Sequence, residues 1–83
     1  MGSKVEIGTD AVGRPAPRLW RNGKCLAQAD FDRISHTPGG RIRIDGFCAF
    51  APIQADGITV KGALTALAQA AYQAELDWKA GRI

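Results

Sequence analysis

The sequence predicts an α+β domain, in which one long C-terminal helix packs on one face of a small antiparallel β-meander of two successive hairpins and four to five strands. Two Asx-Gly dipeptides between apolar arms and a helical period of apolar residues near the C-terminus support it. Because 83 residues suffice for one core, we expect a single domain. Its parts are an N-terminal strand and Gly/Pro loop over 1–17, hairpins over 18–60 and the helix over 61–81.

The first hairpin is the clearest local prediction. Asn22-Gly23 is typical of a type I′ turn, because both residues accept the positive φ that this turn requires. Strands are therefore predicted over 17–21 and 24–28. Before them, alternation at Val5 and Ile7 indicates a short strand, and two Gly and two Pro within 8–17 indicate a loop.

A second hairpin is predicted over 41–50 with Asp45-Gly46 as its turn. At an offset of 23 residues it shares three identities and two conservative matches with the first. This similarity indicates either a duplicated hairpin or convergence on the same turn chemistry. Alternatively, 41–51 forms one unbroken strand with a bulge at Gly46. That register places Ile42, Ile44, Cys48 and Phe50 on one face and moves Phe47 to the face of the arginines.

The remaining segments contain turns and the helix. Residues 29–40 predict one helical turn and then a His-Thr-Pro-Gly-Gly turn, and Asp56-Gly57 predicts a further turn before a short strand at 58–60. A helix over about 62–80 follows from strong helix formers and the absence of Pro, with Thr59 as candidate N-cap and Gly81 at C′. Its apolar stripe comprises Val60, Leu64, Leu67, Ala68, Ala71, Ala74 and Trp78.

Charge is concentrated in the first half of the chain. Residues 1–43 hold eight Lys/Arg and four Asp/Glu (+4), whereas 44–83 hold three and four (−1), which together make +3. This balance fits a solvated basic face or a polyanionic partner. The excess of Arg over Lys, with much Gly and Ala, is typical of a GC-rich bacterial genome and suggests a phage or mobile-element origin.

Alternation along the predicted hairpins identifies the candidate binding face. The leucine/isoleucine face, which holds Leu19 and Leu26, is expected to seat the helix. The opposite face of the first hairpin holds Arg18, Trp20, Cys25 and Ala27. Arg41 and Arg43 face outward in both registers considered for 41–51. The candidate binding residues are Arg18, Trp20, Arg41, Arg43 and Phe50.

The leading functional hypothesis is a non-enzymatic binding protein, an adaptor, regulator or inhibitor that occupies a surface of a larger protein partner. Arg, Trp and Phe are the kinds of residue that act as anchors in such interfaces. An alternative is a nucleic-acid-binding module, in which the aromatic rings stack on bases and the arginines hold phosphates. A third interpretation is that residues 1–17 or a second subunit cover this face, and exposed sheet edges are compatible with a homodimer.

No residue set predicts a catalytic or metal site, and no cofactor is expected. Enzymatic use of His36 with Asp30 or Asp32 stays an alternative that would need a partner to complete a pocket. The spacing of Cys25, His36 and Cys48 does not match a zinc site, so free, packed cysteines are expected. The sequence has no apolar run long enough for a membrane span and no signal peptide, so we expect a cytoplasmic protein with no membrane association.

Overall fold

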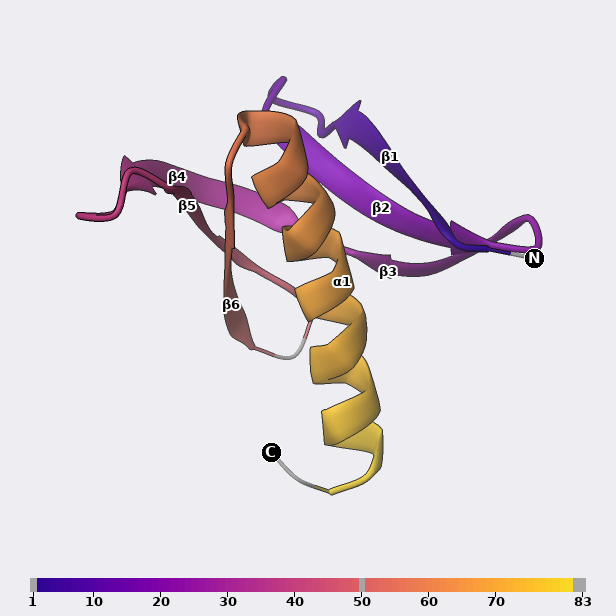
Figure 1. Ribbon diagram of the computed structural model, residues 1–83. Helices are drawn as coiled ribbons and strands as arrows, with labels where there is room; N and C mark the ends of the chain where they lie inside the picture. The colour runs from indigo at the N-terminus through magenta and orange to yellow at the C-terminus, as the bar shows by residue number, and fades with distance from the viewer. Residues whose placement is uncertain (1, 50, 82–83) are drawn as a thin grey trace.

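The computed structural model of the protein describes residues 2–49 and 51–81 (Figure 1). Within them, all strand pairs are antiparallel and form two three-stranded sheets, ordered β1-β2-β3 and β4-β5-β6, with one long helix, α1. The predicted α+β class is confirmed, with six strands in place of four to five. The elements are β1 (Lys4–Thr9), β2 (Pro15–Arg21), β3 (Lys24–Gln28), β4 (Asp30–His36), β5 (Ile42–Phe47), β6 (Pro52–Gly57) and α1 (Val60–Lys79).

The β1–β3 sheet follows the local sequence signals. Asn22 and Gly23 have φ values of 53° and 77° and connect β2 to β3, as predicted. The predicted loop over 8–17 is shorter, because β1 and β2 extend into it and leave 10–14 as the connection. The predicted register fails beyond Trp20, since a bulge at Leu26 pairs Leu19 with Ala27. Ala27 therefore packs against the core and does not join the face of Arg18.

The chain passes from one sheet to the other through a single residue. Ala29 is fully buried between β3 and β4, and its N–H donates to the carbonyl of Pro17 on β2 at 3.0 Å. The helical turn predicted at the start of 29–40 is wrong, because β4 begins at once and pairs with β5 along its length. The turn predicted after His36 is confirmed, with Gly40 at a φ of 80°.

Two turns predicted in the second half of the chain do not lie at their Asx-Gly dipeptides. Asp45-Gly46 lies within β5 and does not reverse the chain. Asp56-Gly57 belongs to the end of β6, and the chain reverses only after it, over 58–59, to enter α1 (Figure 1). The reason is packing: a Cβ at Gly46 would collide with the carbonyl oxygen of Asp30, and one at Gly57 would lie 2.5 Å from the backbone nitrogen of Ala63 on α1. The duplicated-hairpin interpretation fails with them. The register of the unbroken-strand alternative is confirmed over β5, residues 42–47, and Cys48 packs against the core as that register requires. The strand does not continue to 51, because β6 begins at Pro52, and the bulge lies in β4, at Asp32, across from Gly46.

The helix is confirmed close to its predicted bounds. It begins at Val60, which replaces the strand predicted at 58–60, and Thr59 caps it by accepting a hydrogen bond from the N–H of Gly62 at 3.0 Å. Gly81 follows the C-cap with a φ of 76°. The middle of the apolar stripe is buried, but Val60 and Trp78 at its two ends are about half exposed. The buried helical residues are Ala63, Leu64, Leu67, Ala68 and Ala71.

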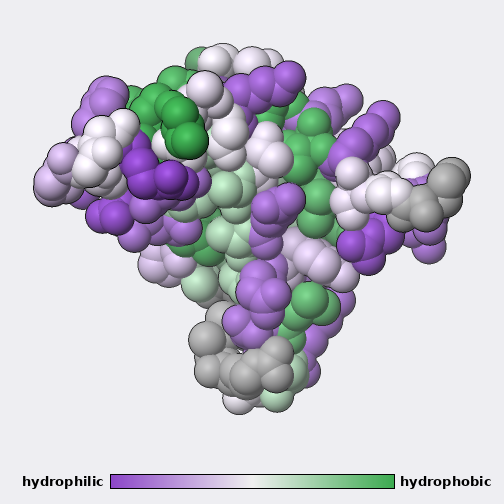
Figure 2. All heavy atoms as spheres, viewed as in Figure 1, coloured by the Kyte–Doolittle hydropathy of each residue, from purple (hydrophilic) through white to green (hydrophobic). Residues whose placement is uncertain are grey.

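The core lies mainly between α1 and the β4–β6 sheet. Ile44 and Leu67 are fully buried there, and the alanines of α1 allow the helix to approach both sheets closely (Figure 1). Hydrophilic side chains run along the solvent side of the helix (Figure 2). No helix in the described part of the chain has the length and apolar character needed to cross a membrane.

Candidate interaction surface

Each sheet turns one face toward α1 and the other away from it. In the β4–β6 sheet, Ile44 and Ala55 pack in the core with α1, so the residues that alternate with them point outward. In the β1–β3 sheet, the guanidinium carbon of Arg21 lies 5.8 Å from the ring centre of Tyr72 on α1. Arg18 and Trp20, which lie at odd spacing from Arg21 on β2, therefore belong to the outer face of that sheet.

The outer face of the β4–β6 sheet is a ladder of cross-strand rows. Arg33, Asp45 and Gln54 form one row, and Ser35, Arg43 and Asp56 form the next. A third row, at the opposite end from Arg43, consists of Asp30, Phe47 and Pro52. Asp32 lies between the first and third rows, at the bulge of β4. We call this set of ten residues the β4–β6 outer face.

Hydrogen bonds hold most of the charges of this face in place. The amide of Gln54 donates to Asp45 Oδ1 at 2.7 Å, and Arg33 Nε lies 3.3 Å from Asp45 Oδ2. These hydrogen bonds, that of Gln54 first, hold the pKa of Asp45 below its ordinary value. Arg43 Nε donates to Asp56 Oδ1 at 2.9 Å, which lowers the pKa of Asp56 and raises that of Arg43. Both carboxylates are therefore ionised at neutral pH.

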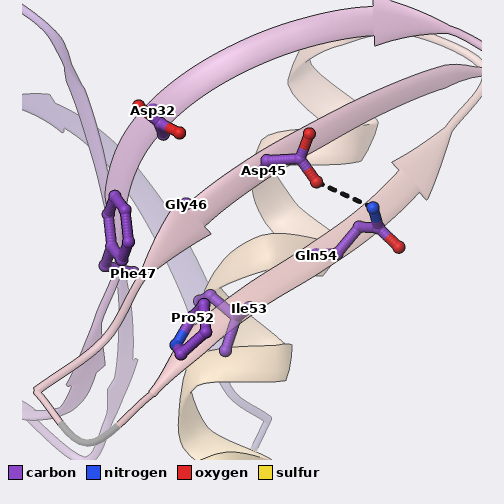
Figure 3. Close-up of a pocket in the computed structure, with 7 residues that line it drawn as sticks. All are labelled: Asp32, Asp45, Gly46, Phe47, Pro52, Ile53 and Gln54. Atoms are coloured by element: carbon purple, nitrogen blue, oxygen red, sulfur yellow. Dashed lines mark hydrogen bonds between the residues drawn. The ribbon is translucent and has the colours of Figure 1, made fainter.

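A hollow of about 340 Å³ opens at the acidic end of this face (Figure 3). Its floor is the backbone of Gly46, whose missing side chain would have pointed toward the core. The ring of Phe47 stands at one side of it, below Asp32, and Pro52 lies beyond (Figure 3). Phe47 is 47% exposed, so its ring is open to a partner. The lining residues are Asp32, Asp45, Gly46, Phe47, Pro52, Ile53 and Gln54.

The outer face of the β1–β3 sheet has a different electrostatic character. Lys4, Glu6, Arg18 and Trp20 lie on it, with Glu6 directly across from Arg18. Among the described residues, neither Lys4 nor Arg18 forms an ion pair with a carboxylate. The Nε of Arg18 and the Nε1 of Trp20 are buried and have no hydrogen-bond acceptor in the described part of the chain.

The structure separates the candidate binding residues that the sequence placed on one face. Arg18 and Trp20 belong to the outer face of the β1–β3 sheet. Arg43 belongs to the β4–β6 outer face, and Arg41 precedes the same strand, close enough to Asp56 to act on its pKa. Phe50 lies outside the described residues.

The residues that line the hollow were not among the binding residues predicted from the sequence. The hairpin predicted over 41–50 would have turned Phe47 toward the helix, on the face of Ile42 and Ile44, although the unbroken-strand alternative placed it correctly with the arginines. The two-residue spacing of Asp30 and Asp32 indicates a shared face only if the segment is a strand, whereas a helical turn was predicted there and no sequence signal marks the bulge at Asp32. Nothing in the sequence pattern indicates that Gln54 would hydrogen-bond Asp45, because that pairing depends on the register of β6.

His36 and the two cysteines do not come together as a site. His36 is exposed at the end of β4, whereas Asp30 begins that strand, about 20 Å away at ordinary strand spacing. Cys25 and Cys48 are free thiols; Cys48 packs against the core as expected, but Cys25 is exposed. Within residues 2–49 and 51–81, no group of three or more His, Cys, Asp or Glu side chains is placed to hold a metal ion.

Comparisons with known proteins do not assign this chain to a family. No protein-family model matches it, and neither the curated proteins nor the solved structures include a significant match.

Proposed function

We propose that this chain is a small, non-enzymatic protein-binding module, an adaptor, regulator or inhibitor of a larger protein, and that the β4–β6 outer face is its contact surface. The main support is the half-exposed Phe47 beside a hollow lined by Asp32 and Asp45, on a face that carries charges of both signs. Protein interfaces commonly combine a central aromatic anchor with a polar rim. The cytoplasm is the proposed location, since it keeps cysteines in the thiol form found here.

The fixed charges of the face also favour binding. Side-chain hydrogen bonds join Asp45 to Arg33 and Gln54, and another joins Arg43 to Asp56. A partner would therefore meet side chains that are largely ordered before it binds. Preordered side chains lose less conformational entropy on association. The lowered pKa values of Asp45 and Asp56 suit permanent anions and oppose a general-acid role at neutral pH.

Selection from a displayed library of random peptides tests this proposal. Immobilised protein should enrich peptides that lose about tenfold or more in affinity for Phe47→Ser, the size of a modest interface hot spot. Val12→Ser is the matched control, because Val12 is an exposed apolar residue in the connection between β1 and β2. The surface assignment is wrong if selected peptides bind Phe47→Ser as well as the unaltered protein, or if no peptide is enriched.

A second candidate function is nucleic-acid binding by the outer face of the β1–β3 sheet. It is favoured by one observation: Lys4 and Arg18 lie beside Trp20 with no ion pair to a carboxylate among the described residues. A labelled single-stranded oligonucleotide should then bind at low salt and dissociate steeply as ionic strength rises. Arg18→Gln should weaken this binding, and Arg43→Gln on the other sheet should not. Absence of binding at low salt excludes this candidate.

A further inference from the structure

We propose that the hollow beside Phe47 receives a cationic side chain, arginine above all, presented by the partner protein. The inference rests on the proposed function, because it names the chemistry that the β4–β6 outer face recognises. It follows from the unpaired carboxylate of Asp32 on the lining of the hollow, from the open ring of Phe47 and from the shape of the floor.

The carboxylates around the hollow differ in how far they are already satisfied. Asp45 accepts hydrogen bonds from Gln54 on one oxygen and from Arg33 on the other. The carboxylates of Asp32 and Asp30, in contrast, have no hydrogen-bond or ion-pair partner among the described residues, and both residues are exposed. Asp32 therefore places one uncompensated negative charge on the lining of the hollow, and Asp30 places a second in the row of Phe47 and Pro52.

The bulge of β4 explains why Asp32 faces the hollow. The pairing of β4 with β5 moves from Phe31 opposite Gly46 to Arg33 opposite Asp45, which leaves Asp32 as the extra residue. A bulge re-aims the side chain at its extra residue and interrupts the ladder. Figure 3 shows the Asp32 carboxylate above the hollow, on the side where the ring of Phe47 stands. Anion and ring thus border one space.

An arginine side chain can contact the Asp32 carboxylate and the Phe47 ring at the same time. Its planar guanidinium can donate two hydrogen bonds to a carboxylate and stack on an aromatic ring, and its methylene stem can lie along Pro52. The cross-strand contact of Arg33 with Asp45, in the neighbouring row, shows the same chemistry within the chain. The basic end of the face does not oppose this, because Arg43 lies four residues from Phe47 along β5, about 13 Å away.

The test is an NMR titration of the full chain with blocked arginine, N-acetyl-arginine amide, against blocked citrulline, which has the same shape without the charge. Arginine should give saturable shifts at the backbone amides of Asp32, Gly46 and Phe47, with citrulline binding about threefold more weakly, the size of an exposed ion pair. Asp32→Asn should remove this preference. Phe47→Leu should lower the affinity for blocked arginine by about threefold, the size of an exposed cation–π contact.

The matched control for Asp32→Asn is Glu6→Gln, which removes an exposed carboxylate from the other sheet and should leave the titration unchanged. Equal binding of arginine and citrulline overturns the inference. So do shifts spread over all exposed carboxylates, or no saturation at the hollow. A concentration-dependent dimer that perturbs the same amides and is lost in Arg41→Gln also overturns it, because the occupant would then be a second copy.

Peptide selection separates this inference from the proposed function. Enriched peptides that require Phe47 and carry an essential Arg or Lys support both. If they require Phe47 but show no preference for Arg or Lys, the binding function stands and the cationic occupant is wrong. If no enriched peptide requires Phe47, the contact surface itself is wrong and the inference falls with it.

Discussion

The Asx-Gly dipeptides of the two sheets serve opposite purposes. Gly23 ends the Asn-Gly turn of the β1–β3 sheet, where it has a positive φ and open space around its Cα. Gly46 and Gly57 also follow an Asx residue, yet they lie in strands of the β4–β6 sheet, where a Cβ has no room against backbone atoms. The same dipeptide chemistry therefore marks a chain reversal in one sheet and a close backbone approach in the other.

The two outer faces differ in charge in a parallel way. Arg33 and Arg43 of the β4–β6 sheet are paired with carboxylates across the strands. Arg18 of the β1–β3 sheet has no such partner among the described residues, although Glu6 lies across from it. Pairing makes the first face a mixed-charge surface, whereas, within the described part of the chain, Lys4 and Arg18 of the second stay unpaired although Glu6 lies on the same face.

The largest expected effect tests the steric role of glycine in the β4–β6 sheet. Gly57→Ala should destabilise the protein by about 3 kcal/mol, because a methyl group would meet backbone atoms of Gly62 and Ala63 that cannot move without shifting α1. Urea denaturation measures the change. Gly39→Ala, with only Thr37 Oγ1 at 3.8 Å, is the control and should stay within about 0.5 kcal/mol.

Replacing the turn glycine of the β1–β3 sheet should destabilise the protein less. Gly23→Ala is expected to destabilise by about 1 kcal/mol, since Ala accepts the positive φ at a modest penalty and meets no neighbouring atom. Gly23→Asn should reduce the stability less than Gly23→Ala, because Asn adopts a positive φ more readily than Ala. A loss for Gly23→Ala as large as that for Gly57→Ala would contradict the distinction between the two sheets.

Replacing an arginine by methionine should change the stability of the protein in opposite directions in the two sheets. Arg18→Met keeps the apolar stem and removes a buried N–H without an acceptor, so it should stabilise the protein by about 0.5 kcal/mol. Arg43→Met removes the ion-pair partner of Asp56 and should destabilise the protein slightly. Thermal unfolding of the two variants side by side checks this, and a change of the same sign in both would show that pairing does not distinguish the faces.

The smallest expected effect is an acid-dependent loss of stability in the β4–β6 sheet. Because the folded pKa values of Asp45 and Asp56 are lowered, their contribution is complete above the unfolded carboxyl pKa of about 4 and is lost as pH falls through the folded values. Denaturation midpoints between pH 7 and pH 2 measure it. Asp56→Asn should flatten the acid limb, while Ser35→Ala in the same row should leave its shape unchanged.

The candidate site was predictable only in part. That Arg41 and Arg43 point away from the core was common to both registers read from the sequence, because alternation on a strand is a local property. The membership of Phe47 depended on whether Asp45-Gly46 turns the chain, which its local chemistry cannot decide. The separation of Arg18 from Arg43 into two sheets depends on Ala29, a short apolar residue whose burial between strands leaves no sequence signal.

The sequence by itself determined the α+β class, the Asn-Gly turn of the first hairpin and the C-terminal helix, predicted over about 62–80, because each rests on short-range patterns: turn conformations, alternation, and caps with a helical apolar period. Only the tertiary structure decided the roles of Gly46 and Gly57, the division into two sheets and the bulge that turns Asp32 toward the hollow. The physical reason is that these features depend on how closely α1 and β4 approach β5 and β6, a distance that local residue patterns do not encode.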